Sequence, residues 1–170
     1  MKRIIWHWTA GGQVPNSHEK ECYHFLVDSF GKVRLGHFKP EANLNCKSGM
    51  YAPHTGGGNT ASIGVALCGM MNFKDKNHLG SCPITRVQFE SAMKLCAQLA
   101  LKYEIPIKST TVMTHYEFGK SHPETSSRGK IDITFLPPFS WLEKDEIGKF
   151  IRSKIKWYLN QITNNKGVNW

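Results

Sequence analysis

An eight-residue run over residues 62–69, SIGVALCG, constrains the fold more than any other feature of the chain. Nearly all of its side chains are apolar or very small, with no alternation between polar and apolar positions. Such a strand is covered on both faces, which is typical of a central strand in a sheet flanked by helices. A second apolar run, IIWHW over residues 4–8, predicts another buried strand almost at the start of the chain.

Two amphipathic helices are expected beside these strands. Residues 85–103 carry apolar side chains at steps of three and four, and Thr85 with Gln88 forms a capping-box pattern at the start. A last helix is expected to begin near Ser140, with Glu143 as its capping partner. Its apolar face is formed by Ile147, Phe150, Ile151, Ile155, Tyr158, Leu159 and Ile162.

Shorter segments complete the prediction of an α/β fold. YHFLVD over residues 23–28 and VRLG over residues 33–36 flank the turn SFGK and predict a hairpin. TTVMTH over residues 110–115 predicts a strand that ends on a histidine, and residues 39–59 form a long loop of a kind that is often functional. At 170 residues, we expect a single domain with a central, mostly mixed β-sheet flanked by α-helices.

Composition narrows the class of protein and its partners. The formal net charge is +9, which favours an anionic partner such as a nucleic acid or a cell-wall polymer, or serves solubility alone. Charge by itself does not choose among these. No recognition helix or RNA motif is recognisable, so a nucleic-acid partner is not expected.

Cysteine usage and the N-terminal residues bear on the compartment. The five cysteines are irregularly spaced without a CxxC pair, which favours reduced thiols over a disulfide framework or zinc finger. The apolar stretch after Lys2 and Arg3 is interrupted at His7, too early for a secretory signal, and no stretch approaches the ~20 apolar residues of a transmembrane helix. We therefore expect synthesis in the cytoplasm without a signal peptide or a transmembrane segment.

Two predicted strands end on histidines, His7 and His115. A polar stretch beyond His115 contains Lys130 and Asp132. Adjacent strand ends can place two imidazoles near one ion, and imidazole nitrogen and carboxylate oxygen are both good zinc ligands, so His7, His115 and Asp132 form a candidate set. Spacing alone is weak support, because eight histidines offer many combinations. Among the others, we expect solvated side chains at His18, His78 and His122, and packed or surface side chains at His24 and His37.

Four motifs, taken in order, resemble the zinc amidase domain of N-acetylmuramoyl-L-alanine amidases. They are IIWHWTAGG, YHFLVDSFGKVRLG, HTGGGNTASIGVALCG and THYEFG followed by RGKIDI, and together they span about residues 2–136. This family includes phage lysis amidases and is related to animal peptidoglycan recognition proteins. The resemblance implies a zinc amidase catalytic core over residues 1–140. We expect residues 141–170 to form a C-terminal helix and tail packed on the same domain.

The resemblance also implies roles for individual residues. His7, in HWTA, would be the first zinc ligand, His115 the second, and Asp132 the third. Lys130, two residues before that aspartate, would be the catalytic lysine, and Tyr23 would act on the attacking water. Without the resemblance, Tyr23 fits a half-buried strand tyrosine and Lys130 a solvated loop lysine.

The loop before SIGV lines the substrate groove in this family, which would bring His54 and Asn59 near bound glycopeptide. His54 also fits an exposed loop residue. The chain departs from many relatives after the third ligand, where they continue with Pro-Gly and this sequence has Ile133 and Thr134.

The implied activity is zinc-dependent hydrolysis, with one catalytic ion, of the amide that joins N-acetylmuramic acid to L-alanine in peptidoglycan. We expect a monomeric phage or prophage lysis enzyme that acts on the bacterial wall after release from the cytoplasm. A non-catalytic peptidoglycan-binding module is the alternative. A common metalloprotease is disfavoured because HExxH is absent.

Overall fold

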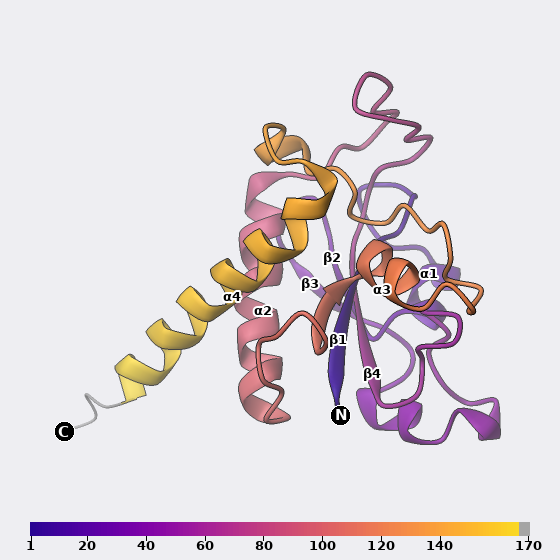
Figure 1. Ribbon diagram of the computed structural model, residues 1–170, viewed down its shortest axis with the longest axis vertical. Helices are drawn as coiled ribbons and strands as arrows, with labels where there is room; N and C mark the ends of the chain where they lie inside the picture. The colour runs from indigo at the N-terminus through magenta and orange to yellow at the C-terminus, as the bar shows by residue number, and fades with distance from the viewer. Residues whose placement is uncertain (167–170) are drawn as a thin grey trace.

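A computed structural model describes residues 1–166, in which five strands form one sheet in the order β3-β2-β4-β1-β5 (Figure 1). Only β3 runs antiparallel to its neighbour; the other pairings are parallel. The mixed sheet and the central position of β4, which carries SIGVAL, confirm the predicted α/β fold with a central strand at this run. The strands are β1 (Arg3–Trp8), β2 (Phe25–Val27), β3 (Val33–Leu35), β4 (Ser62–Leu67) and β5 (Val112–Thr114).

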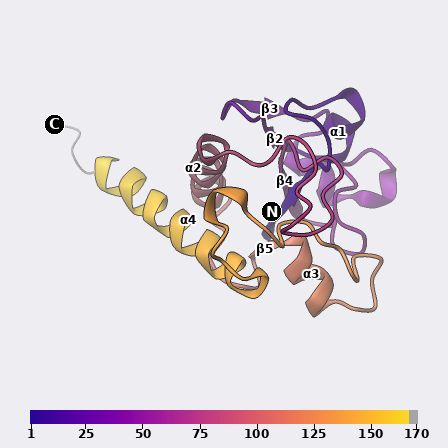
Figure 2. The same cartoon turned by 90° about the horizontal axis from the view of Figure 1, so that it is seen from above.

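Helices lie on both sides of this sheet. The two long helices, α2 (Arg86–Lys102) and α4 (Lys144–Lys166), pack together on one face. The short helices α1 (Ser17–Cys22) and α3 (His115–Ser121) lie on the other side, as the view from above shows (Figure 2). The capping box predicted at Thr85 and Gln88 is present at the start of α2.

The two faces of β1 have different neighbours because side chains alternate along a strand. Ile4, Trp6 and Trp8 belong to the main hydrophobic core, which is filled by apolar side chains of α2 and α4. Ile5 packs instead with Met113 and Phe118 on the opposite face. His7 has the same parity as Ile5, so its ring lies on that second face rather than in the main core.

Two boundaries differ from the predictions. His115 is the first residue of α3 rather than the last residue of a strand, and part of the stretch expected to be irregular is helical. The physical reason is a capping box between Thr114 and Glu117, which starts a helix directly after β5. At the other end, Pro137–Phe139 forms a 3-10 helix that ends at Ser140, so α4 begins later than predicted.

The C-terminal helix also supports the segment that carries His115. Arg152 of α4 lies 3.0 Å from the Glu117 carboxylate and donates a hydrogen bond of 3.0 Å to the carbonyl of Val112. Contacts between α4 and α2 anchor the same helix to the main core. The predicted tail falls partly on residues 167–170, which lie outside the described residues, and the division of the chain at residue 140 stays a prediction.

A buried histidine anchors the long loop to the sheet. His24 accepts a hydrogen bond of 2.9 Å from the Gly64 amide at Nδ1, and its Nε2 lies 3.0 Å from the Asn43 side-chain oxygen. The Asn43 amide group in turn donates to the carbonyls of Ala52 and Asn59. The loop is therefore held in place by side-chain contacts, with two short 3-10 helices, Pro40–Leu44 and Cys46–Ser48, inside it.

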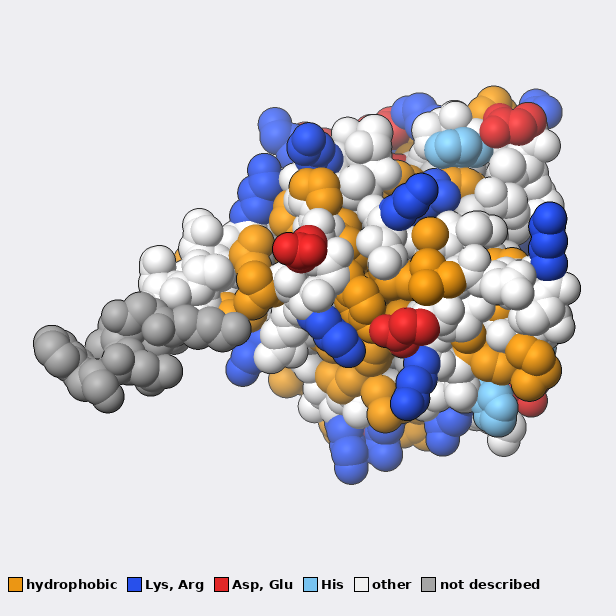
Figure 3. Space-filling view, turned by 90° about the horizontal axis from the view of Figure 1, so that it is seen from below, with side chains coloured by type: hydrophobic (Ala, Val, Ile, Leu, Met, Phe, Trp, Pro, Cys, Tyr) orange, Lys and Arg blue, Asp and Glu red, His pale blue; other side chains and the backbone are white. Residues whose placement is uncertain are grey.

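The cysteines, the hydropathy of the helices and the surface charge can each be read from the structure. All five cysteines have free thiols, as expected. Within residues 1–166, no helix combines the length and hydropathy needed to cross a membrane. On the face seen from below, Lys and Arg side chains are spread among apolar ones and acidic side chains are few (Figure 3).

Candidate metal centre and cleft

His7 and His115 meet because their strands are neighbours. β1 and β5 are parallel and pair Trp6 with Thr114, so the residues that follow lie side by side at the carboxyl end of the sheet. The two imidazole ring centroids are 4.6 Å apart. Both side chains are almost fully buried. The prediction that two strand ends bring these histidines together is confirmed, although His115 reaches the position from the first turn of a helix.

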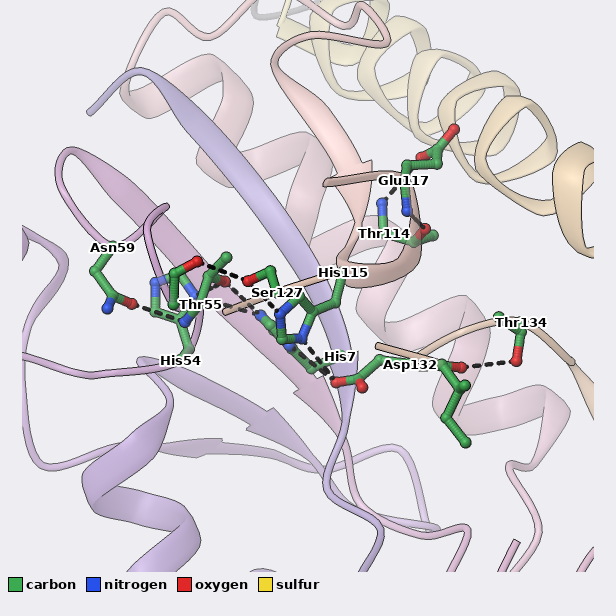
Figure 4. Close-up of polar contacts among 12 residues, drawn as sticks. His7, His54, Thr55, Asn59, Thr114, His115, Glu117, Ser127, Asp132 and Thr134 are labelled. Carbon is green, nitrogen blue, oxygen red and sulfur yellow. Dashed lines mark hydrogen bonds and ion pairs between the residues drawn. The ribbon is translucent and has the colours of Figure 1, made fainter. Parts of the chain in front are cut away.

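Asp132 completes the group from the loop after α3 (Figure 4). Its Oδ2 atom lies 3.1 Å from His7 Nδ1 and 3.2 Å from His115 Nδ1. One ligand atom from each of the three residues lies within 4.8 Å of the others. Burial acts to raise the pKa of Asp132, but its polar contacts with the rings of His115 and His7 outweigh it, so the pKa lies below its ordinary value. The carboxylate is therefore ionised at neutral pH.

The outer nitrogen of His115 has its own acceptor. His115 Nε2 lies 3.0 Å from the hydroxyl oxygen of Ser127, and that hydroxyl donates a hydrogen bond of 2.7 Å to the carbonyl of Gly56. Because the hydroxyl proton goes to the carbonyl, Ser127 is left to accept from His115 Nε2–H. This arrangement leaves the lone pair of His115 Nδ1 free on the side that faces Asp132.

The outer nitrogen of His7 is held by a chain of two residues, His54 and Thr55. His54 Nε2 lies 3.3 Å from the carbonyl of Ser62, which only accepts, so His54 Nδ1 is the accepting nitrogen. The Thr55 hydroxyl lies 2.8 Å from that Nδ1 and 3.3 Å from His7 Nε2. It donates to His54 and accepts from His7, which leaves the Nδ1 lone pair of His7 free.

The rings of His7 and His54 are both neutral because they are buried. Burial, followed by weaker effects of neighbouring groups, lowers the pKa of His7 from its ordinary 6.5 to about 4, and burial also lowers the pKa of His54. A glycine makes room for the second ring. A Cβ atom at Gly64, in the middle of β4, would lie 2.5 Å from Cγ of His54.

These residues fit a zinc ion. Two neutral imidazole nitrogens and one carboxylate oxygen are a typical protein ligand set for catalytic zinc, which keeps a further position for water or substrate. Metal-binding histidines almost always donate their other ring N–H to an oxygen acceptor, as His7 does to Thr55 and His115 to Ser127. Sequence reasoning missed Ser127, because a serine in a polar loop carries no signal of its contact with His115.

A cavity of about 760 Å³, here called the metal cleft, opens over this group. Tyr23, His54 and Lys130 line it together with His115 and Asp132. The Tyr23 ring centroid lies 5.1 Å from that of His7, but the residue is the C-cap of α1 rather than part of a strand. Burial first, and then the nearby Asp132 charge, raises the pKa of Tyr23, so its hydroxyl is protonated at neutral pH.

Asn59 does not line the metal cleft. Its side-chain oxygen accepts a hydrogen bond of 2.7 Å from the Thr55 amide, so the residue shapes the turn that carries His54 and Thr55. A contact of Asn59 with substrate stays a prediction. Of the other histidines, His18, His37 and His78 are exposed, whereas His122 is half-buried with its ring stacked 4.2 Å from Phe118.

The residue after the third ligand has an unusual backbone. Ile133, at the departure from the Pro-Gly of many relatives, has a φ of 63° and a fully buried side chain. A β-branched residue in the left-handed region is strained by its own Cβ branch. Packing of Ile133 in the main core holds this conformation, and so the apolar core helps fix the position of Asp132.

By its fold and its His–His–Asp group, the chain is an α/β protein with a candidate metal centre at the carboxyl ends of parallel strands. The family model of N-acetylmuramoyl-L-alanine amidase matches residues 1–130, and the chain belongs to this family of peptidoglycan amidases. The resemblance inferred from the sequence motifs is thereby confirmed. Comparison with curated protein sequences gives no match.

Solved structures establish the same fold. An N-acetylmuramoyl-L-alanine amidase from Clostridium intestinale is 19% identical with a TM-score of 0.56, covering 91% of this chain and 85% of that one. The endolysin of the Thermus scotoductus bacteriophage Ph2119 is 19% identical with a TM-score of 0.51, covering 89% of this chain and 82% of that one.

Proposed function

We propose that this protein hydrolyses the amide between the lactyl group of N-acetylmuramic acid and L-alanine, with one Zn²⁺ held by His7, His115 and Asp132. The proposal rests on the hydrogen bonds that the two histidines make through Nε2, His7 with Thr55 and His115 with Ser127. Thr55 and Ser127 leave the Nδ1 lone pairs of both histidines free on the side of the Asp132 carboxylate. A buried cluster that served folding alone would not need this arrangement.

Zinc, when bound, supplies a Lewis acid that polarises the amide carbonyl and lowers the pKa of water. Tyr23 lies in the metal cleft beside this group, and its hydroxyl is protonated at neutral pH. We therefore assign it the orientation of the attacking water by hydrogen bonding, rather than removal of the proton. Its position against the His7 ring supports this role.

Lys130 supplies the positive charge in the metal cleft. It is exposed, lines the cleft and forms no ion pair within residues 1–166. An ammonium group so placed stabilises the negative charge that develops on the carbonyl oxygen when the amide is attacked. His54 acts through His7, because its ring is almost fully buried and its nitrogens are engaged by Thr55 and Ser62.

The family and the charge support action on the bacterial cell wall as a lysis enzyme released from the cytoplasm of an infected cell. On the face seen from below, basic side chains are scattered rather than gathered in one patch, and acidic ones are few, which favours adsorption to anionic wall polymers (Figure 3). Such adsorption weakens at high salt, because exposed charges are screened beyond about 8–10 Å.

The deciding experiment is a product assay on purified peptidoglycan, with and without a chelator. New alanine amino termini that require zinc, without new reducing sugar ends, are the expected result. Wall binding without either product would make the protein a recognition module instead. Reducing ends alone would indicate a glycosidase and overturn the proposed roles.

A further inference from the structure

The short helix α3, which carries His115, depends on contacts beyond its own backbone, because helices shorter than about 12 residues are marginal on their own. Its first turn is closed by a capping box. Glu117 Oε2 accepts a hydrogen bond of 2.9 Å from the Thr114 amide, and the Thr114 hydroxyl accepts one of 3.0 Å from the Glu117 amide (Figure 4). His115 lies between these two residues in the chain. The position of its backbone therefore depends on where the Glu117 carboxylate is held.

Arg152 of α4 holds that carboxylate. Its Nη1 atom lies 3.0 Å from each carboxylate oxygen of Glu117 and also donates a hydrogen bond of 3.0 Å to the carbonyl of Val112. Val112 belongs to the edge strand β5 and precedes His115 in the chain, whereas Glu117 follows it. One guanidinium group therefore fastens the backbone on both sides of the candidate metal ligand.

Gly148, one turn before Arg152, makes room for the same carboxylate. It is buried within α4, where a glycine destabilises the helix relative to alanine because it loses more conformational freedom on folding. A Cβ atom at this position would overlap Oε1, Cδ and Oε2 of Glu117. Gly148 and Arg152 thus form a recess in the surface of α4 that fits the Glu117 carboxylate, here called the Glu117 notch.

A second ion pair between the same two helices differs from the notch in its exposure. Lys120 of α3 lies 2.8 Å from Asp145 of α4, but these side chains are 64% and 56% exposed, so their attraction contributes little. The Arg152 and Glu117 side chains are only 14% and 23% exposed. Loss of the guanidinium group would leave a partly buried carboxylate without its cation, which is costly. The attachment of α3 to α4 therefore depends on the notch more than on the outer pair.

We propose that α4 positions the metal ligand His115, with Gly148 and Arg152 as positioning residues that act through Glu117. This inference rests on the proposed function for the metal. The family model matches residues 1–130, so both positioning residues lie outside the matched part of the chain. Their role differs from that of Ser127, which orients the His115 ring, because the notch fixes the backbone from which the ring projects.

The test measures zinc affinity by competition with a chromogenic chelator, beside urea unfolding of the zinc-free protein. Arg152→Met removes the guanidinium group but keeps an apolar side chain, and zinc affinity should fall about tenfold, the lower end of the range for groups that orient a metal ligand. Arg152→Lys restores a cation and should recover part of the affinity.

Two control variants separate positioning from stability. Ile155→Val trims the core face of α4 and should lower the unfolding midpoint without changing zinc affinity. Asp145→Asn breaks the exposed pair with Lys120 and should also leave zinc affinity unchanged. In Gly148→Ala the helix propensity of α4 rises, yet zinc affinity should fall, because the new Cβ displaces the Glu117 carboxylate.

Wild-type zinc affinity in Arg152→Met, or an equal loss of affinity in Ile155→Val, would overturn the positioning role while leaving the amidase intact. If the wild type itself bound no zinc, the proposed function would fail instead. Amide hydrogen exchange of the zinc-free protein would then still decide whether the notch holds the first turn of α3. Exchange at Thr114 and Glu117 should be faster in Arg152→Met than in Ile155→Val, and equal rates would contradict the proposal.

Discussion

The two faces of β1 stabilise their buried side chains in different ways. On one face, Trp6 packs among apolar side chains of α2 and α4 and is fully buried. On the other, His7 is just as buried but depends on a hydrogen bond to Thr55 and lies beside the Asp132 carboxylate. Apolar packing tolerates swaps that conserve volume, whereas a buried polar network is costly as soon as one member is missing. The same strand therefore carries a robust core face and a sensitive functional face.

Removal of a metal ligand from the functional face of β1 should have the largest effect on activity. His7→Ala is expected to lose zinc and to reduce amidase turnover by on the order of 10³-fold or more, because a bound metal contributes several kcal/mol to such reactions. Metal analysis and turnover on peptidoglycan measure the two effects. Trp6→Phe, one residue away on the core face, is the matched control and should retain zinc. Full zinc occupancy in His7→Ala would reject the ligand set.

Loss of the cleft cation should have the next largest effect. Lys130→Ala is expected to fold, bind zinc and turn over about 10²–10³-fold more slowly, because a charge aimed at the developing oxyanion is removed. Steady-state kinetics together with zinc content separate this effect from metal loss. Lys47→Ala, an exposed lysine of the long loop, should have wild-type kinetics. Near-normal turnover of Lys130→Ala would remove the lysine from the mechanism.

Loss of the hydrogen bond between His115 and Ser127 should weaken zinc binding. Ser127→Ala removes the acceptor for His115 Nε2–H, so zinc affinity should fall by about 10–100-fold. Competition with a chromogenic chelator measures that affinity without any assay of activity. The exposed neighbour Ser126 offers a matched control, Ser126→Ala, for which no change is expected. Unchanged affinity in Ser127→Ala would mean that the orientation of His115 is fixed by packing alone.

The smallest expected effect is a fall in the free energy of unfolding as the pH is lowered below neutral. Burial, as the largest cause, lowers the pKa of His7 and of His24 to about 4 from an ordinary 6.5. Below pH 6.5 the unfolded chain binds protons at these positions and the folded chain does not, so unfolding becomes easier as pH falls toward 4. Urea unfolding of the zinc-free protein should show a declining midpoint over this range. A flat profile would contradict the neutral, buried state of both rings.

Much of the fold follows from local patterns in the chain. The apolar run at residues 62–69 forms the central strand, and the spacing and capping pattern at Thr85 and Gln88 lead to α2. α4 begins later than the capping pattern at Ser140 predicts, because Pro137 begins a separate 3-10 helix. Local signals are reliable where one pattern is strong and fail where two compete.

Local patterns in the sequence predict the buried strands, the long helices and two histidines close to strand ends, because periodicity and strand ends are local properties. Tertiary contacts show which nitrogens face Asp132, that His24 anchors the long loop, and that Asn59 supports the turn beside His54 rather than the cleft wall. Those outcomes depend on hydrogen bonds between segments far apart in the chain, such as Ser127 with Gly56. No residue spacing encodes them, since they form only when the whole domain is packed.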